Sequence, residues 1–182
     1  MAPGPANRPA PPIRAARTGD LPAILAIHND VIATSTAIYS IAPDSLEGRR
    51  AWFDARVAAG FPVRVAEVDG TVGGFASFGE FRGAWPGYRY SVEHSVHVRA
   101  DCRGQGLGAA LVAALLQDAA ALGKHVMIGG IDAANTASLR MHARLGFAQV
   151  AHLREVGHKF GRWLDLVLVQ RFIDAPGAAR TA

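Results

Sequence analysis

The chain has 182 residues, which fits one compact domain, because a domain takes roughly 150 residues. Half of its residues are hydrophobic and 19% are charged, a balance that is typical of soluble globular proteins and excludes a disordered chain. The formal net charge is +4, but no basic run is long enough for a nucleic-acid arm and no apolar run reaches the roughly 18 residues of a membrane-spanning helix, so neither partner is expected.

The two ends of the chain differ in composition from the rest. Residues 1–12 contain five prolines among Ala, Gly and Asn, and such a segment buries too little apolar surface to offset the entropy of ordering it. This predicts a disordered tail, and because it also lacks the regions of a secretory signal, we expect a cytoplasmic protein. Residues 174–182 have the same character and are predicted to fray. A single domain is therefore expected at residues 13–173.

The domain is predicted to begin with a short strand and two helices. The strand is expected at residues 13–16. Thr18 can cap the first helix, in which apolar residues then recur at helical spacing. Asp44 with Glu47 three residues later has the pattern of a capping box and predicts the start of the second helix.

A hairpin and a long strand are predicted next. Residues 62–68 and 71–78 are rich in β-forming residues and are joined by Asp69-Gly70, a strong hairpin signal. A loop over residues 79–87 then leads to residues 88–98, in which apolar and polar side chains alternate as in a strand.

The remaining elements begin with a glycine-rich turn, Arg103 to Gly108, which precedes a helix that ends at Gly123. Further segments are predicted as a strand at 126–131, a helix at 135–145, and strands at 147–153 and 163–172. The order β-α-α-β-β-β-α-β-α-β-β predicts an α+β fold, with helices that flank a mixed sheet.

The glycine-rich turn is a candidate anion site. It lies between a strand and a helix, so free backbone N–H groups and the helix dipole favour an anion there, and glycine lets the backbone approach a pyrophosphate closely. No Gly-Lys-Ser/Thr sequence follows, which excludes a Walker loop, and the spacing fits a dinucleotide fingerprint poorly. From the residues alone, a purely steric role for the glycines stays open.

The pattern Arg103-x-x-Gly106-x-Gly108 resembles the acetyl-CoA pyrophosphate motif of the GNAT N-acetyltransferase superfamily, and the order of elements over residues 13–172 resembles that family's order. More narrowly, the chain is similar to phosphinothricin and methionine sulfoximine N-acetyltransferases. The segments that carry this similarity are Thr36-Ala37-Ile38-Tyr39, residues 88–96 (YRYSVEHSV), residues 135–142 (NTASLRMH) and residues 156–165 (VGHKFGRWLD). The resemblance implies the GNAT acyl-CoA N-acyltransferase fold, whose central mixed sheet is mostly antiparallel, with acetyl-CoA as cofactor and an amino-acid-sized acceptor with a free α-amine.

The same resemblance implies which residues hold the cofactor. Val96, His97 and Val98 would line the pantetheine arm with their backbone groups; relatives usually have tyrosine in place of His97, so no role is carried over to its side chain. Asn135 and Ser138 would reach the cofactor from the next helix, although the sequence without the resemblance favours a plain helix N-cap for Asn135. The residues expected around the pyrophosphate are Arg103, Gly104, Gln105, Gly106, Leu107, Gly108 and Ala109.

Acetyl transfer needs a base, because an α-amine with a pKa near 8 is mostly protonated at neutral pH. Glu93 is the candidate base, as the one acidic side chain on its face of the predicted strand; a solvated carboxylate is the alternative. His142 is the candidate acid or base because the resemblance implies a histidine there, whereas a helix histidine is otherwise a packing or surface residue. Backbone N–H groups near Val96 would stabilise the oxyanion. The single cysteine, Cys102, is in no reactive pattern and excludes an intramolecular disulfide, so direct attack in a ternary complex is expected, without a metal.

An amino-acid acceptor also carries a carboxylate, and arginine suits such forked acceptors. Each candidate for this contact could equally be a surface residue. The resemblance further implies a homodimer that forms through the late strands. The residues expected to contact the substrate are Tyr39, Arg82, Pro86, Gly87, Tyr88 and Tyr90.

The sequence therefore predicts an N-acetyltransferase that detoxifies amino-acid analogues such as methionine sulfoximine, methionine sulfone or phosphinothricin. An acetyltransferase for another small amine, an amino acid or a protein N-terminus is the alternative. A non-catalytic acyl-CoA-binding module is a third possibility, but it would be expected to lack Glu93 or the glycine turn, and the chain has both.

Overall fold

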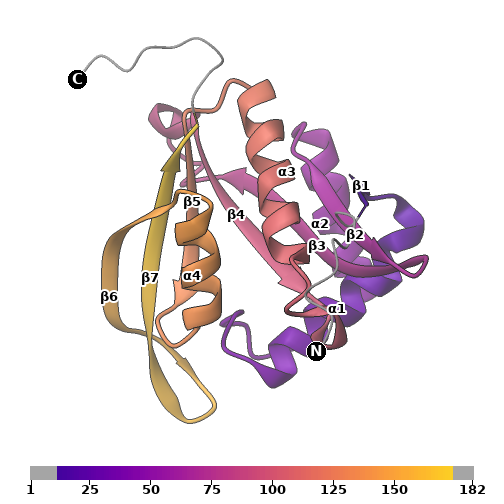
Figure 1. The fold of residues 1–182 in the computed structure, drawn as a ribbon, viewed down its shortest axis with the longest axis horizontal. Helices are drawn as coiled ribbons and strands as arrows, with labels where there is room; N and C mark the ends of the chain where they lie inside the picture. The colour runs from indigo at the N-terminus through magenta and orange to yellow at the C-terminus, as the bar shows by residue number, and fades with distance from the viewer. Residues whose placement is uncertain (1–11, 174–182) are drawn as a thin grey trace, which may run out of the picture.

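The computed structural model describes residues 12–173 (Figure 1), so the predicted tails, Pro12 apart, lie outside the described residues. A single seven-stranded sheet in the order β1-β2-β3-β4-β5-β7-β6 forms the centre. The strands are β1 (Ile13–Ala15), β2 (Val63–Val68), β3 (Thr71–Glu80), β4 (Ser91–Val98), β5 (Val126–Asp132), β6 (Ala148–Lys159) and β7 (Arg162–Phe172). The helices are α1 (Leu21–Thr34), α2 (Leu46–Ala58), α3 (Leu107–Ala121) and α4 (Thr136–Arg144).

The sheet is mixed and mostly antiparallel, as predicted. Only β4 and β5 pair in parallel, and every other described pair is antiparallel. The order of strands and α-helices along the chain matches the predicted order. No helix within residues 12–173 is long and apolar enough to cross a membrane.

Helices cover both faces of the sheet (Figure 1). On one face, α1 and α2 pack on β2 and β3 through a cluster that includes Leu21, Phe53 and Phe75. On the other face, α3 packs on the centre of the sheet through residues such as Leu111 and Leu115. Burial of these apolar stripes is the main force that holds helices to the sheet.

Two hairpins depend on residues with positive φ. Asp69 (φ 51°) and Gly70 (φ 75°) join β2 to β3 as predicted, in the pattern of a two-residue turn that matches the twist of the strands. Phe160 (φ 52°) and Gly161 (φ 71°) form a similar turn between β6 and β7. The prediction ended the sixth strand at residue 153, which is wrong, because the strand continues through an irregularity to Lys159.

The predicted caps of the first two helices are wrong. Thr18 does not cap α1; it starts a 3-10 turn, and the Asp20 carboxylate accepts the backbone N–H of Arg17 at 2.7 Å. At α2, the cap is Ser45, whose hydroxyl accepts from the backbone N–H of Gly48, while Asp44 instead binds Arg49 at 2.7 Å. The fourth strand begins at Ser91 and not at residue 88, because residues 86–88 form a 3-10 turn.

Candidate active site

The parallel strands β4 and β5 separate partway along their length. Their pairing runs from Ser91 opposite Val126 to His94 opposite Gly129 and then stops. Beyond this point β4 pairs with β3 alone and β5 with β7 alone in the described part of the chain. The separation opens a cavity of about 80 Å³. It is lined by Ala37, His94, Ser95, Val96, His97, Gly129, Gly130, Ile131, Asp132, Asn135, Ser138 and His142.

The free edge of β4 bears the residues predicted to bind the pantetheine arm. Val96 and His97 line the cavity and Val98 follows them. Because β5 has left β4 here, backbone groups that point toward β5 are available to an extended ligand. The His97 ring packs against Phe75 and His28, and burial lowers its pKa to about 3. The ring of His97 is thus packed on the α1 side of the sheet.

The glycine turn leads directly into the N-terminus of α3. Gly104 and Gly106 have φ of 74° and 83°, values that favour glycine, and no side chain of the described residues caps the helix. The first N–H groups of α3 are therefore open to an anion. Arg103 donates to the carbonyl of Val98 at 3.2 Å and so ties the turn to the end of β4. The side chain of Leu107 is buried in the core, which leaves only its backbone for a ligand.

Asn135 both caps α4 and lines the cavity. Its side-chain oxygen accepts the backbone N–H of Ser138 at 3.1 Å. The two roles that the sequence left open for Asn135, a cap and a residue at the cofactor cavity, are therefore compatible in this structure.

His142 meets a second histidine that the prediction did not include among the site residues. The Nε2 atoms of His94 and His142 lie 2.9 Å apart, and both side chains are buried. Phe147 packs against both rings. A Cβ on Gly129 would lie 2.6 Å from Cε1 of His94, so the glycine makes room for this ring. The feature of the sequence that could have identified His94 is its inward-facing position in the strand, where an apolar residue is usual.

The proton positions in this pair follow from its other contacts. The Nδ1 atom of His94 lies 2.8 Å from the carbonyl oxygen of Ile128, and that of His142 lies 2.8 Å from the carbonyl oxygen of Ser138. A carbonyl oxygen only accepts, so each Nδ1 carries a proton and donates it. If both rings were neutral, each Nε2 atom would carry a lone pair and neither could donate a hydrogen bond to the other. The contact between the Nε2 atoms becomes a hydrogen bond when the pair holds one additional proton.

Glu93 lies next to His94 in β4, and its side chain therefore projects from the opposite face of the sheet. It is exposed, and within residues 12–173 its carboxylate has neither a hydrogen bond nor an ion pair. Its Oε1 atom lies 3.5 Å from the position of a Cβ on Gly130 of β5. The protein atoms around the carboxylate raise its pKa by desolvation. A raised pKa and a free carboxylate suit a general base.

Tyr39, a predicted substrate residue, lies in the segment between α1 and α2. Its hydroxyl donates to the backbone carbonyl of Asp165 at 3.0 Å, and its ring occupies the space beside Gly157. Lys159 fixes the same segment, because its ammonium group donates to the carbonyls of Ser35 and Ile38. These contacts hold the segment against the β6–β7 hairpin and bring Ala37 to the cavity.

The other predicted substrate residues lie together in the exposed loop between β3 and β4, and none of them lines the cavity. The guanidinium of Arg82 lies 5.6 Å from the ring centroid of Tyr88. Arg89 packs in the same manner over Tyr90, at 4.5 Å. The members of this loop group are Arg82, Pro86, Gly87, Tyr88 and Tyr90.

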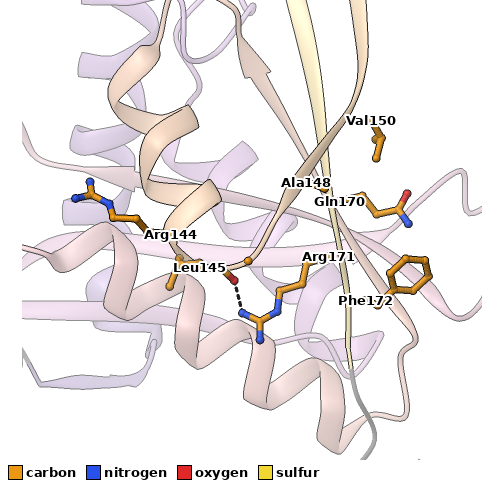
Figure 2. Close-up of a pocket in the computed structure, with 8 residues that line it drawn as sticks. Arg144, Leu145, Ala148, Val150, Gln170, Arg171 and Phe172 are labelled. Atoms are coloured by element: carbon orange, nitrogen blue, oxygen red, sulfur yellow. Dashed lines mark hydrogen bonds between the residues drawn. The ribbon is translucent and has the colours of Figure 1, made fainter. Parts of the chain in front are cut away.

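A larger groove of about 690 Å³ lies at the C-terminal end of α4, away from the separated strands. Figure 2 shows the guanidinium of Arg171, a residue of β7, donating to the carbonyl of Leu145. The groove contains none of the predicted site residues. Over residues 12–173, no group of three or more His, Cys, Asp or Glu side chains could hold a metal ion. Cys102 is buried and its thiol pKa is raised by desolvation, which disfavours the nucleophilic thiolate.

Residues 24–147 match the model of the acetyltransferase (GNAT) family. The chain is 48% identical over 168 residues to the L-methionine sulfoximine/L-methionine sulfone acetyltransferase of Pseudomonas aeruginosa, with 92% of this chain and 97% of that protein covered. It is 46% identical over 162 residues to the L-amino acid N-acyltransferase MnaT of Escherichia coli, with 89% and 94% covered. It is also 39% identical over 164 residues to the phosphinothricin N-acetyltransferase of Alcaligenes faecalis, with 90% and 83% covered.

Two similar solved structures contain the cofactor. YncA of Salmonella typhimurium, solved with acetyl-CoA, superposes with a TM-score of 0.87 at 43% identity, covering 94% of this chain and 98% of that one. A GNAT phosphinothricin acetyltransferase from Sinorhizobium meliloti, in complex with acetyl-CoA, superposes with a TM-score of 0.89 at 32% identity, covering 94% and 93%. These structures confirm the fold that the resemblance implied.

Proposed function

Because this chain belongs to the acetyltransferase (GNAT) family and is an acetyl-CoA-dependent N-acetyltransferase, we propose that it acetylates the α-amine of L-amino-acid analogues. The analogues are methionine sulfoximine, methionine sulfone and phosphinothricin, which the names of its relatives give as their substrates. Such acetylation removes the charge of the amine and so detoxifies compounds that mimic an amino acid.

The observation that carries this proposal is the arrangement of two titratable sites on either side of β4. Glu93 projects toward the face covered by α1 and α2, whereas His94 meets His142 of α4 on the opposite face. The cavity between β4 and β5 joins the two faces, since Ser95 and His97 line it together with His94 and His142. An acceptor on one side and a thioester on the other would meet in this opening.

The proton inventory assigns a role to each site. The acceptor ammonium loses one proton to Glu93, and the free amine attacks the thioester carbonyl, which forms the C–N bond and an oxyanion. Backbone N–H groups of β4 near Val96 stabilise the oxyanion. Collapse breaks the C–S bond, and the departing thiolate takes a proton from His142. The nitrogen loses its second proton to solvent, and the proton on Glu93 returns through solvent to the histidine pair, so that one amide, one thiol and one released proton result.

The cofactor would extend from the cavity to the glycine turn. Val96, His97 and Val98 offer backbone groups to the pantetheine arm, and the N-terminus of α3 offers its N–H groups and dipole to the pyrophosphate. Asn135 and Ser138 border the cavity on the α4 side. The thioester that acetyl-CoA supplies is the activated acyl group of the reaction.

A thiol-release assay with acetyl-CoA tests the proposal. The acceptors are L-methionine sulfoximine, L-methionine sulfone, L-phosphinothricin, plain L-methionine and an N-terminal peptide. We expect turnover of the three analogues and little or none of the peptide. Preferred turnover of plain methionine would favour a general amino-acid acyltransferase, the activity that the name of the Escherichia coli relative gives. Turnover of the peptide alone, or of nothing, would contradict the proposal.

We also propose that the protein is a cytoplasmic homodimer. The β6–β7 hairpin exposes several large apolar side chains, which is typical of a protein interface. Sedimentation analysis should give about twice the 19.2 kDa mass of one chain, and a monomer at micromolar concentration would contradict this. The cytoplasm is where cells keep the acetyl-CoA that the reaction consumes. The exposed residues are Val150, Leu153, Val156, Phe160 and Trp163.

A further inference from the structure

Arg56, in the last turn of α2, lies over the backbone of β3. A Cβ on Gly79 would overlap Nη1 of Arg56, and Nη2 lies 2.8 Å from the same position. The φ of Gly79 is not in the left-handed region, so the backbone conformation does not require glycine there. The glycine instead leaves room for the guanidinium group, which lies where a side chain at position 79 would be.

Gly79 is the register partner of Glu93 across the antiparallel pair of β3 and β4. Side chains of directly paired residues project from the same face, with Cβ atoms about 5 Å apart. The guanidinium of Arg56 therefore takes the place of the nearest cross-strand neighbour of Glu93. The two groups therefore lie on one face, which we assign to the acceptor, with the guanidinium over β3 and Oε1 of Glu93 reaching toward Gly130 of β5.

Neither group has a partner. Within residues 12–173, no hydrogen bond or ion pair involves the side chain of Arg56, and its Nε is buried without an acceptor. Burial lowers the pKa of the guanidinium, and no carboxylate in the described part of the chain offsets this effect. Among the described residues Glu93 is likewise unpaired, although its carboxylate is on the same face of the sheet.

The other half-buried or buried arginines among the described residues all have an acceptor. A buried cation is costly to leave unpaired, and elsewhere this chain avoids it. The pairs are Arg14 with Asp20 and Glu67, Arg49 with Asp44, Arg64 with Asp118, Arg99 with Asp101, and Arg171 with the carbonyl of Leu145.

We propose that Arg56 binds the α-carboxylate of the acceptor while Glu93 receives the proton of its α-amine. An α-amino acid carries both groups on one carbon, so it can bridge a guanidinium and a carboxylate that are neighbours but not paired with each other. The fork of arginine binds a carboxylate through two parallel hydrogen bonds. This inference rests on the proposed function, and it makes Arg56 the residue that selects α-amino acids over simple amines.

The test compares two acceptors that differ only in the carboxylate. These are L-methionine sulfone and its decarboxylated counterpart, 3-(methylsulfonyl)propylamine, each measured at saturating acetyl-CoA. In Arg56→Met we expect KM for the amino acid to rise about 10- to 100-fold, the range of a lost charge-assisted contact, while KM for the amine stays unchanged. Arg56→Lys should recover part of the loss. Arg50→Met, an exposed arginine of the same helix, is the matched control.

Equal loss with both acceptors would mean that Arg56 only shapes the site. An unchanged KM for the amino acid would also overturn the proposal, as would a shift of the pH profile alone, which would make Arg56 a group that tunes Glu93. Circular dichroism spectra of the variants identify any that fail to fold.

A binding measurement separates this proposal from the proposed function. The Arg56 Nε–H resonance in an ¹⁵N spectrum should shift on addition of L-methionine sulfone to the wild-type protein and not on addition of the amine. If the resonance shifts without turnover, the carboxylate contact stands and the proposed reaction is wrong. If acetylation occurs without the shift, the reaction stands and the role of Arg56 is wrong.

Discussion

The Nε2 atoms of His94 and His142 lie 2.9 Å apart, although the residues are 48 positions apart in the chain and belong to a strand and a helix. Both Nδ1 atoms are occupied by carbonyl acceptors, so the pair gains a hydrogen bond when it takes up one proton. Burial, and then the charge of the neighbouring ring, lower the pKa of His94, so the two rings do not both carry an additional proton at neutral pH.

We predict that His94 keeps His142 protonated and thus available as the acid. The acid acts below its pKa, so activity should fall as the pH rises through the pKa of the pair. In His94→Phe, His142 stands alone in a buried site that lowers its pKa, and the descending limb of the kcat profile should move to lower pH. Adding His142→Gln to His94→Phe should cost little more than either change alone, since the two act as a unit.

The control for this experiment is His125→Phe, because His125 is an exposed histidine that packs against Phe172. A descending limb that stays in place in His94→Phe, or that moves to higher pH, would contradict the shared proton. So would ¹⁵N spectra in which the two imidazoles of the wild-type protein titrate independently.

Glu93→Gln should lower kcat about 10²- to 10⁴-fold, which is the usual contribution of a general base, and leave the Kd for acetyl-CoA unchanged. It should also make the fold more stable at neutral pH. The pKa of Glu93 is raised in the folded state, so the fold favours the protonated carboxyl group over the charged one. The stability that this group contributes is present in acid and is lost as the pH rises through the raised pKa. The gain in Tm over the wild type should therefore vanish in acid. A parallel loss of kcat and of acetyl-CoA binding would indicate a structural role for Glu93.

The sequence predicts the parts of this site that depend on local chemistry. The Asp69-Gly70 turn, the glycine turn before α3 and the alternation that projects Glu93 and His94 from opposite faces all follow from neighbouring residues. The turn at Phe160-Gly161 was missed because an aromatic residue with positive φ is rare. The cap of α2 was misplaced because Asp44 and Ser45 are adjacent and both suit that position.

Contacts between distant segments could not be predicted from one sequence. His94 and His142 meet because the fold brings α4 against β4, and nothing in either local pattern encodes that distance. In the sequence, Arg56 looks like an ordinary residue on the surface of a helix. Its place in the site follows from its position over Gly79, which pairs with Glu93 across β3 and β4.

Gly106→Val should abolish acetyl-CoA binding, measured by calorimetry. Gly106 has φ of 83° and immediately precedes α3, so valine would strain the turn and tilt the N–H groups that we assign to the pyrophosphate. Gly60→Val is the matched control, since Gly60 has φ of 71° and lies between α2 and β2, away from the glycine turn. Both variants should lose some stability, but only the first should lose the cofactor. Retained binding in Gly106→Val would mean that the glycines serve only to turn the chain.

Lys159→Met should weaken the fold and the acceptor site together. Lys159 is 4% exposed, and its ammonium group donates to the carbonyls of Ser35 at 2.8 Å and Ile38 at 2.7 Å. A hydrogen bond to a charged group contributes about 1.5–3 kcal/mol, so loss of both should lower Tm by at least about 4 °C for a chain of this size. The segment that carries Ala37 and Tyr39 would then detach from the β6–β7 hairpin. KM for the acceptor should therefore rise, whereas the Kd for acetyl-CoA, which is set by β4 and α3, should not. Arg162→Met provides the control, because Arg162 is an exposed cation of the same hairpin. If Lys159→Met left Tm and acceptor KM at their wild-type values, the lysine would not be what holds the segment over the cavity.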